Sequence, residues 1–466
     1  MFTQNIECYP MKRLAAAAAL LALAAAVFAN PVEPSKAVDA AGFGVKADGK
    51  TPSAEALQKA IDSFPGAAGG AVRLPAGRIL LDRTVTVREN VELMGAGDSW
   101  ENTNTVFVVR HREGPAFSLG AYCGVKGVSV EYPDNLSDDK MRRPDEYGPA
   151  FELTGSNVNL EYINFDGAWI GVASRGTGSN NGQSLFSNIN GFCHHRGFWL
   201  SGAADINRFE NVHFFPSRTN QYTEPDAYFA HHLIAFDFGR QDGAMFTDCF
   251  IIMGRSFFRQ SVDSPGPGSN TGIPDLPYNA SLGYGFFGCW IEAVDTGFDI
   301  EGVCGFNITN CNVLVNKGGT GIRIAPEVIA YNGAVTGTQI RGFGGDSDFC
   351  GINYDLMLKY WSHCALNKLT VSDCQIQGAS PAVRAGKNAR RLWLKGCLLS
   401  GTQKSPAVVI EKGAEYIFVK DNIFQTENAS WPRPLKCAAG LKGLDVKNNV
   451  FEDLSKQKPK AEESEK

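Results

Sequence analysis

The stretch Ala204–Pro216 of this 466-residue chain holds the side chains that most resemble a chemical site. It reads ADINRFENVHFFP, and in it the polar residues Arg208, Glu210 and His213 alternate with apolar ones. A cation, a carboxylate and an imidazole so close together could neutralise an anionic substrate and transfer a proton. The same residues could equally be a weak surface ion pair and an ordinary surface histidine.

A short unit containing this stretch recurs along the chain. Each copy has an apolar residue, then a small turn residue two positions later, then an inward position that we call the slot. The slot residues include Ile189, Val212, Cys249, Cys289, Cys311, Cys374 and Cys397. Alternation of apolar residues on both sides of a fixed turn predicts short strands broken by a bend. Spacings in the low twenties predict a solenoid.

The position after each slot should point outward, because side chains alternate along a strand. This outward column reads Asn190, His213, Phe250, Trp290, Asn312 and Gln375, and Phe215 and Glu292 lie two residues beyond it. Exposed aromatic rings in a line suit stacking on sugar rings. We therefore predict substrate contacts for Trp290, Phe250, Phe215 and Glu210, although loops could instead cover these rings.

A neighbouring segment adds further charged groups. Residues 236–242 read FDFGRQD and contribute Arg240 and Asp242. Adjacent histidine pairs occur at 194–195 and 231–232, and at least one histidine of each pair must face away or lie in a turn. The predicted catalytic set is therefore His213, Arg208, Arg240, Asp242 and Glu292.

The N-terminal part predicts a cap for the solenoid. Thr51 is the expected N-cap and Pro52 the first residue of an amphipathic helix that runs to about Phe64. Glycine-rich turns and short strands follow it. A helix at this place would cover the open end of a stack that otherwise exposes strand backbone.

Three motifs of residues 38–97 carry a resemblance to a known family: FGVKADGKT, GGAVRLPAGRILL and VELMGAG. With the helix between the first two, they resemble the N-terminal signature of the pectate-lyase superfamily. The segment departs from that signature at VKA (45–47) and at Arg78, where the family often has an aromatic residue. The resemblance implies an all-β fold, a right-handed parallel β-helix with an N-terminal capping helix.

The superfamily includes polysaccharide lyases, glycoside hydrolases, epimerases and phage tailspikes, so the resemblance narrows the substrate class more than the reaction. The chain lacks the NTD, paired-Asp, GHG and RIK set of polygalacturonases. It also lacks the WxDH and RxPxxR pattern of the best-known pectate lyases. No catalytic residue is carried over from the family.

Three segments are expected along the chain. Residues 1–29 resemble a signal peptide, with an apolar run from Leu14 to Phe28 and cleavage after Ala29, which predicts a secreted protein. Residues 30–454 form one β-helix domain, in which residues 38–97 are the cap and first coils. Residues 455–466 are a charged tail expected to be disordered. The apolar run is too short for a comfortable membrane span, and no later segment qualifies.

The net charge and the cysteine content limit which partners and cofactors the sequence predicts. A net charge of −5 gives no electrostatic support for nucleic-acid binding. The cysteines at the slots favour a row of buried free thiols over disulfides, because adjacent strands lie about 4.8 Å apart. No metal-ligand spacing such as CxxC appears. The sequence requires no cofactor and leaves a calcium ion open.

Two insertions, at about 217–232 and 260–283, interrupt consecutive coils and are expected to wall a groove on the middle of the solenoid. The part of the chain after Val371 shows mainly Ser, Gln, Lys and Arg at outward positions, and we interpret it as scaffold.

Three functions remain open. A lyase acting on a uronic-acid polymer needs a cation and a base, for which Arg208 or Arg240 with His213 are available without metal. A hydrolase needs two carboxylates, and its candidates are Asp237, Asp242, Asp248, Glu292 and Asp295. A glycan-binding protein without catalysis needs only the aromatic column. The arginine and histidine content favours the lyase slightly.

Overall fold

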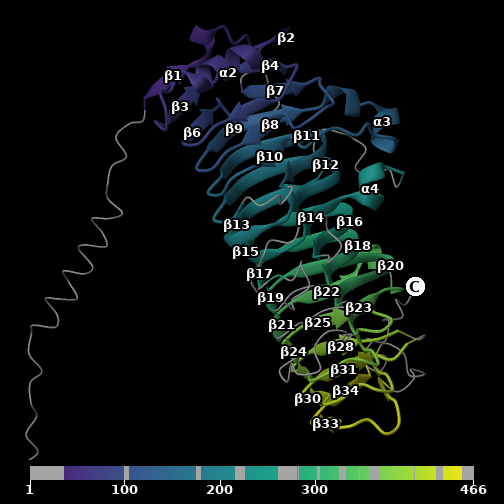
Figure 1. The fold of residues 1–466 in the computed structure, drawn as a ribbon. Coiled ribbons are helices and arrows are strands. Elements are labelled where there is room, and N and C mark those ends of the chain that lie inside the picture. Colours follow the sequence, from purple (N-terminus) through teal and green to yellow (C-terminus); the bar gives the residue numbers. More distant parts are fainter. Residues whose placement is uncertain are drawn as a thin grey trace, which may run out of the picture.

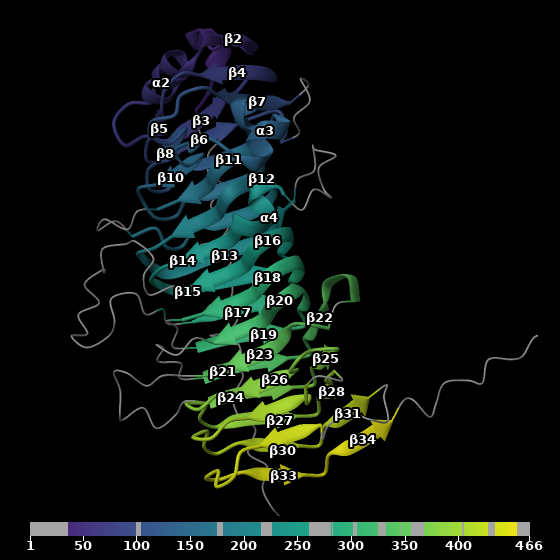
Figure 2. The ribbon, with the colours of Figure 1, turned by 90° about the vertical axis from the view of Figure 1, so that its right-hand side faces the viewer.

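A computed structural model describes residues 36–98, 104–174, 180–215, 226–260, 281, 283–301, 305–324, 332–345, 347–355, 368–402, 405–426 and 434–453. These residues build one long parallel sheet that coils about an axis, with the N-terminal coils at one end and the C-terminal coils at the other (Figures 1 and 2). The predicted all-β, right-handed parallel β-helix is confirmed.

Each full coil contributes to three faces, A, B and C. Face A holds β1 (Ala37–Asp39), β3 (Gly70–Arg73), β6 (Val91–Met94), the first parts of β9 (Gly124–Glu131), β11 (Asn159–Ala173), β12 (Leu185–Leu200) and β13 (Ala203–Phe214), then β15 (Gln241–Thr247), β17 (Tyr284–Phe287), β19 (Gly305–Thr309), β21 (Asn332–Thr336), β24 (Lys368–Ser372), β27 (Leu392–Lys395), β30 (Phe418–Lys420) and β33 (Asp445–Lys447).

Face B follows face A in every coil. It holds β2 (Asp48–Pro52), β4 (Gly77–Leu81), β7 (Thr105–Val109), the later parts of β9 and β13, the middles of β11 and β12, the first parts of β16 (Phe250–Gln260), β18 (Trp290–Ile300) and β20 (Asn312–Ile324), then β22 (Gln339–Gly342), β25 (Gln375–Gln377), β28 (Leu398–Ser400), β31 (Ile423–Thr426) and β34 (Val450–Asp453).

Face C closes each coil. It holds β5 (Val85–Val87), β8 (Phe117–Leu119), β10 (Phe151–Leu153), the ends of β11 and β12, β14 (Ile234–Phe238), the ends of β16, β18 and β20, then β23 (Cys350–Tyr354), β26 (Val383–Ala385), β29 (Val408–Ile410) and β32 (Leu435–Cys437). Five strands, β11, β12, β16, β18 and β20, run from face B into face C without a loop.

A single residue in the left-handed conformation turns each coil from face A to face B. In most coils Asn, Asp or Gly occupies this position, because these residues tolerate positive φ better than others; in β11 the turn residue is Tyr162, with φ 54°. Asn211 has φ 54°, and its side-chain amide donates to Asn188 Oδ1 of the preceding coil at 2.8 Å. The turn predicted from the sequence is confirmed, and its amides bond from coil to coil.

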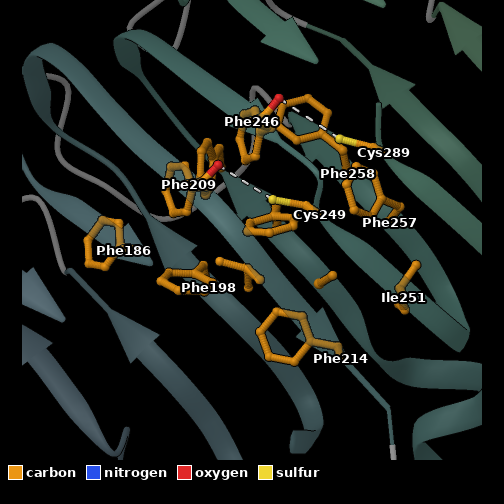
Figure 3. Close-up of a cluster of buried hydrophobic side chains, with 14 of the residues drawn as sticks. Phe186, Phe198, Phe209, Phe214, Phe246, Cys249, Ile251, Phe257, Phe258 and Cys289 are labelled. Carbon is orange, nitrogen blue, oxygen red and sulfur yellow. Dashed lines mark hydrogen bonds between the residues drawn. The ribbon is translucent and has the colours of Figure 1, made fainter. Parts of the chain in front are cut away.

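The core is a stack of aromatic rings inside the coil. Phe209 stacks on Phe246 with ring centroids 4.7 Å apart (Figure 3). Phe246 stacks in turn on Phe286 at 4.6 Å. The slot cysteines are free and buried, as predicted. Cys249 Sγ donates to the carbonyl of Phe209 at 3.6 Å, so each thiol satisfies the backbone of the coil before it.

The cap differs from its prediction at the helix start. Helix α2 (Ala54–Asp62) begins after Ser53, whereas Thr51 belongs to β2. The Asp48 carboxylate accepts hydrogen bonds from the backbone of Lys50 and from both the backbone and hydroxyl of Thr51. This local turn holds Thr51 in the strand, so the predicted N-cap was wrong. The 3₁₀ helix η1 (Ala40–Phe43) packs beside α2.

Arg78, where the sequence departs from the superfamily signature, forms an ion pair with Glu131 of β9. The pair joins β4 to a strand two coils away along face B. The arginine that stands in place of an aromatic residue is therefore held by an ion pair.

Three short helices lie outside the coils of the middle part: η2 (Pro133–Asn135), α3 (Asp138–Arg142) and α4 (Tyr228–His232). Helices α3 and α4 are neighbours on one side of the solenoid (Figure 1). A fourth, η4 (Phe343–Gly345), follows β22.

Several sequence predictions fall outside the described residues. These are the signal peptide at 1–29, the tail at 455–466, most of the insertion at 260–283, and residues 217–225 of the other insertion. Among the helices of the described ranges, none combines the length and apolar character that a membrane crossing requires.

Candidate functional site

The predicted outward column exists on face B. The strand register places His213 opposite Phe250, Phe250 opposite Trp290, and Trp290 opposite Asn312. The rings of His213 and Phe250 are 5.5 Å apart, and Phe215 lies 6.2 Å from Phe250. The side chains predicted to bind sugar therefore do line up along the axis.

Trp290 is the most open ring of this column, with 46% of its surface exposed. Its indole Nε1 donates to Glu292 Oε2 at 3.3 Å, which fixes the carboxylate beside the ring. His213 is half-buried. Burial lowers the pKa of its imidazole, and the backbone and carboxylate of Asp248 oppose that shift.

The other predicted residues lie elsewhere on the coil. Arg208 and Glu210 are exposed on face A, on the far side of the turn at Asn211. Arg240 and Asp242 form an ion pair near the start of face A, where Arg240 also donates to the carbonyl of Ala203 at 3.2 Å. The catalytic set predicted from sequence is thus divided among three places around the coil.

A different group of charged residues converges on face C. We call Arg196, Arg255, Arg259 and Asp237 the arginine cluster. Arg196 Nε donates to Asp237 Oδ2 at 2.5 Å, and Arg259 Nε lies 3.3 Å from Asp237 Oδ1. Asp237 is only 1% exposed, whereas Arg255 is exposed. One buried carboxylate therefore holds two of the three guanidinium groups.

The coils place these residues together although they are far apart in sequence. Asp237 of β14 is opposite Arg259 of β16 and Trp199 of β12. Arg259 is in turn opposite Asp299 of β18, which faces Arg323 of β20. Successive coils thus alternate in charge along face C: Asp237, Arg259, Asp299, Arg323.

Aromatic rings border the arginine cluster. Trp169 stacks on His195 with centroids 4.6 Å apart and an interplanar angle of 6°. Tyr228 of α4 lies 5.5 Å from Trp169 and stacks on His232 at 3.9 Å. Helix α4 packs on β12 and β16, the strands that carry Arg196 and Arg255. The insertion at 217–232 therefore does place its helix over face C.

The electrostatics of this region are dominated by positive charge. Burial, together with Arg196, His232, Arg255 and Arg259, lowers the pKa of His195 to about 3. His195 is therefore neutral at pH 7. Burial raises the pKa of the Tyr228 hydroxyl; Arg196 opposes this shift and Glu146 adds to it. Arg196 and Arg259 pair with the buried Asp237, and Arg255 adds a further positive charge near Arg196, so the surface suits an anionic ligand.

The next coils continue the same charge pattern with satisfied pairs. Arg323 donates to Asp299 at 2.7 Å and to Glu301 at 2.8 Å. Burial raises the pKa of Asp299, which the hydrogen bonds from Arg323 oppose. Asp299 also attracts Arg259, so this pair stabilises the scaffold and offsets part of the cluster's positive charge.

The carboxylates proposed for a hydrolase are already engaged. Asp237 binds two arginines, Asp242 binds Arg240, and Asp295 accepts from the amide of Asn316 at 3.1 Å. Asp248 occupies a turn at φ 52°. Across the described ranges, no three His, Cys, Asp or Glu side chains are grouped so that they could hold a metal ion.

Sequence reasoning noted Asp237 and the histidine pairs, but it did not select Arg196, Arg255, Arg259, Trp169 or Tyr228. The alternation of β12 breaks at this point. His194 is buried, whereas the adjacent His195 and Arg196 are both partly exposed, so residue spacing gave no signal for this site.

No protein-family model and no curated protein matches the chain. Solved structures do resemble it. The pre-mature gene product 12 of bacteriophage phi29 is 11% identical with a TM-score of 0.58, covering 93% of this chain and 59% of that one. The N-terminal fragment of the same phage protein is 12% identical with a TM-score of 0.56, covering 93% and 74%.

The A-module of the mannuronan C-5 epimerase AlgE6 from Azotobacter vinelandii is 12% identical with a TM-score of 0.47, covering 89% of this chain and 99% of that module. Identities this low describe a shared fold. The similar structures support a right-handed β-helix and do not single out the pectate-lyase superfamily.

Proposed function

We propose that this protein is a secreted enzyme that cleaves an acidic, uronic-acid-containing polysaccharide by β-elimination on face C, beneath α4. The observation that carries the proposal is the arginine cluster. Two of its guanidinium groups are held by the buried Asp237, and a third, Arg255, is exposed beside them. A uronate carboxylate would complete the charge balance of this surface.

The arginines would do the first part of the chemistry. Bound to a uronate carboxylate, they lower the cost of the negative charge that develops when the adjacent carbon loses its proton. Asp237 orients Arg196 and Arg259 before the substrate arrives, which avoids reorganisation during the reaction.

The aromatic border would supply proton transfer. We assign the removal of the α-proton to the imidazole of His232, which acts as the base and whose ring stacks on Tyr228. The electron pair of that C–H bond forms a carbon–carbon double bond, and the neighbouring glycosidic C–O bond breaks. The Tyr228 hydroxyl carries its proton at neutral pH, as an ordinary phenol does, and it can donate that proton to the departing oxygen.

The face B column would extend the contact with the polymer. Trp290, Phe250 and Phe215 present rings along the axis, and exposed rings of this kind stack on sugar faces. Glu292, held by the indole of Trp290, can accept a hydrogen bond from a sugar hydroxyl. These residues are proposed as binding contacts, and His213, Arg208, Arg240, Asp242 and Glu210 as the alternative site.

A panel of acidic polysaccharides, including polygalacturonate and alginate, tests the reaction. β-Elimination creates an unsaturated sugar with strong ultraviolet absorbance. We expect Tyr228→Phe to lower kcat by about 100-fold, the range in which general acid–base groups contribute. Tyr162→Phe is the matched control, because Tyr162 is exposed on the surface of another coil.

Three results would point elsewhere. Reducing ends without unsaturation would indicate a hydrolase. Binding without any cleavage would indicate a non-catalytic glycan-binding protein. If His213→Ala or Arg240→Ala lowers the rate by tenfold or more while Tyr228→Phe does not, the site lies with the residues first predicted from sequence.

A further inference from the structure

The C-terminal coils carry a surface that the proposed reaction does not use. On face A, Lys395 of β27 is opposite Lys420 of β30, which is opposite Lys447 of β33. Trp393 and Phe418 are opposite each other in the neighbouring outward column. On β24, Thr370 is opposite Trp393, and Lys368 lies two residues before Thr370. We call the four lysines together with Trp393 and Phe418 the lysine–aromatic patch. The strands that carry it are stacked at the C-terminal end (Figure 2).

The lysines of this patch repeat the same charge on successive coils. Like charges directly opposite each other on neighbouring strands destabilise a sheet. One carboxylate lies among them: Asp445 pairs with Lys420 at 2.6 Å and with Lys447 at 3.4 Å. Within the described part of the chain, Lys395 has no acidic partner.

Face C of the same molecule shows the alternative arrangement. There the outward column alternates as Asp237, Arg259, Asp299 and Arg323, and each charge meets its opposite on the next coil. A fold that needed only stability could use that pattern on face A. The repeated lysines instead leave positive charge for a ligand to neutralise.

The aromatic rings of the patch are open to the ligand. Trp393 is 41% exposed, although an indole buries well, and its ring lies 4.7 Å from that of Phe418. Lys368 Nζ is 4.9 Å from the centre of Trp393, and Lys420 Nζ is 5.5 Å from the centre of Phe418. The half of the chain interpreted from its sequence as scaffold therefore carries two aromatic residues at outward positions.

We infer that the lysine–aromatic patch binds an acidic polysaccharide chain laid along the solenoid axis, away from the catalytic face. Coils rise by about 4.8 Å, close to the length of one sugar residue in an extended chain. Each lysine can therefore meet the carboxylate of a successive uronate, while Trp393 and Phe418 contact sugar faces. The choice of uronate, and only that choice, rests on the proposed function.

A single-stranded nucleic acid fits this surface less well. Proteins that bind it stack bases on aromatic side chains along a basic groove. Here the rings of Trp393 and Phe418 are 4.7 Å apart, which leaves no gap for a base to enter between them.

Electrophoresis of the full chain through gels containing polygalacturonate measures this binding. The probe is compared with neutral dextran and with single-stranded DNA. The protein carries Tyr228→Phe in every arm, so that cleavage of the polymer in the gel is slowed by about 100-fold. We expect Lys395→Glu with Lys447→Glu to raise Kd at least about tenfold, and Trp393→Ala to do the same. Lys412→Glu is the matched control, since Lys412 is an exposed lysine in a turn outside the patch.

The inference is supported if the gel polymer retards the patch variants less than the Lys412→Glu control. The retardation of the control should also disappear as salt is added. It is overturned if the patch variants and the control are retarded equally, or if the patch variants lose affinity only for DNA. Cleavage by patch variants with wild-type Tyr228 is assayed separately on short oligosaccharides and should be unchanged. A protein that cleaves nothing yet loses binding through the patch would refute the proposed function alone.

Discussion

Asp237 determines what the arginine cluster can bind. A carboxylate that is 1% exposed would be costly if unpaired, and two guanidinium groups offset that cost. In return the carboxylate fixes those groups in place. Among the described residues Asp237 pairs with Arg196 and Arg259, so the charge of Arg255 beside Arg196 stays available to a ligand. This single residue therefore connects the stability of face C with its chemistry.

Histidine burial makes the stability of the fold depend on pH. His194 is fully buried, and desolvation lowers its pKa to about 4, against 6.5 in the unfolded chain. Between these values the unfolded chain binds more protons, so stability is complete above pH 6.5 and falls as the pH drops toward 4. We expect this residue alone to remove about 2–3 kcal/mol of unfolding free energy between pH 7 and pH 4.5.

Urea unfolding at the two pH values measures this loss. His194→Gln keeps a donor for the carbonyl of Asn135, which lies 3.2 Å from His194 Nε2, but it cannot titrate. Between pH 7 and pH 4.5, the variant should lose about 2–3 kcal/mol less unfolding free energy than the wild type. An identical pH dependence in the two proteins would show that His194 is not the group responsible.

At the scale of elements, the turn from face A to face B explains why much of the fold was predictable. In most coils the left-handed residue is Asn, Asp or Gly, with Tyr162 of β11 an exception, and apolar residues stand at fixed distances around it. Both signals survive in the sequence. The inward rows and the outward column through His213, Phe250 and Trp290 can therefore be assigned from residue spacing alone.

The passage from face B to face C leaves no such signal. It is a bend inside continuous strands, and its register shifts from coil to coil, as between Ile291 and Val294. The loops from face C back to face A also vary in length. Residues on face C could not be aligned by spacing, which is why Arg196, Arg255 and Arg259 were missed while Arg208 and His213 were chosen.

The turn itself gives an element-scale prediction. Asn211→Ala should cost about 1–2 kcal/mol, because alanine is strained at φ 54° and the amide bond to Asn188 is lost. Asn211→Gly relieves the strain and loses only the hydrogen bond, so its cost should be smaller. Urea unfolding of the two variants separates these contributions. Equal losses would show that backbone strain at this turn is unimportant.

At the scale of the whole molecule, stability should vary along the axis. The inward row that contains Phe246 continues to Val446 at the last coil, where 40% of the side chain is exposed. We expect Phe246→Ala to cost about 3–5 kcal/mol, as for a large ring removed from a packed core. Val446→Ala should cost less than about 1 kcal/mol.

Hydrogen exchange read peptide by peptide checks this gradient, because a solenoid need not unfold in one step. Protection should fall around the middle coils in Phe246→Ala and only at the C-terminal coils in Val446→Ala. Uniform loss of protection in both variants would mean that the solenoid behaves as one cooperative unit.

The direction of the hydrogen bonds between coils has a mechanical consequence. In a parallel β-helix these bonds point along the long axis, so a pull on the two ends loads the bonds of one coil boundary at a time. The chain should then peel from an end in discrete steps. A coil such as that from Ile189 to Val212 spans 23 residues and would release roughly 70 Å of extended chain. The molecule would act as an extensible tether whose resistance is set by its weakest coil boundary.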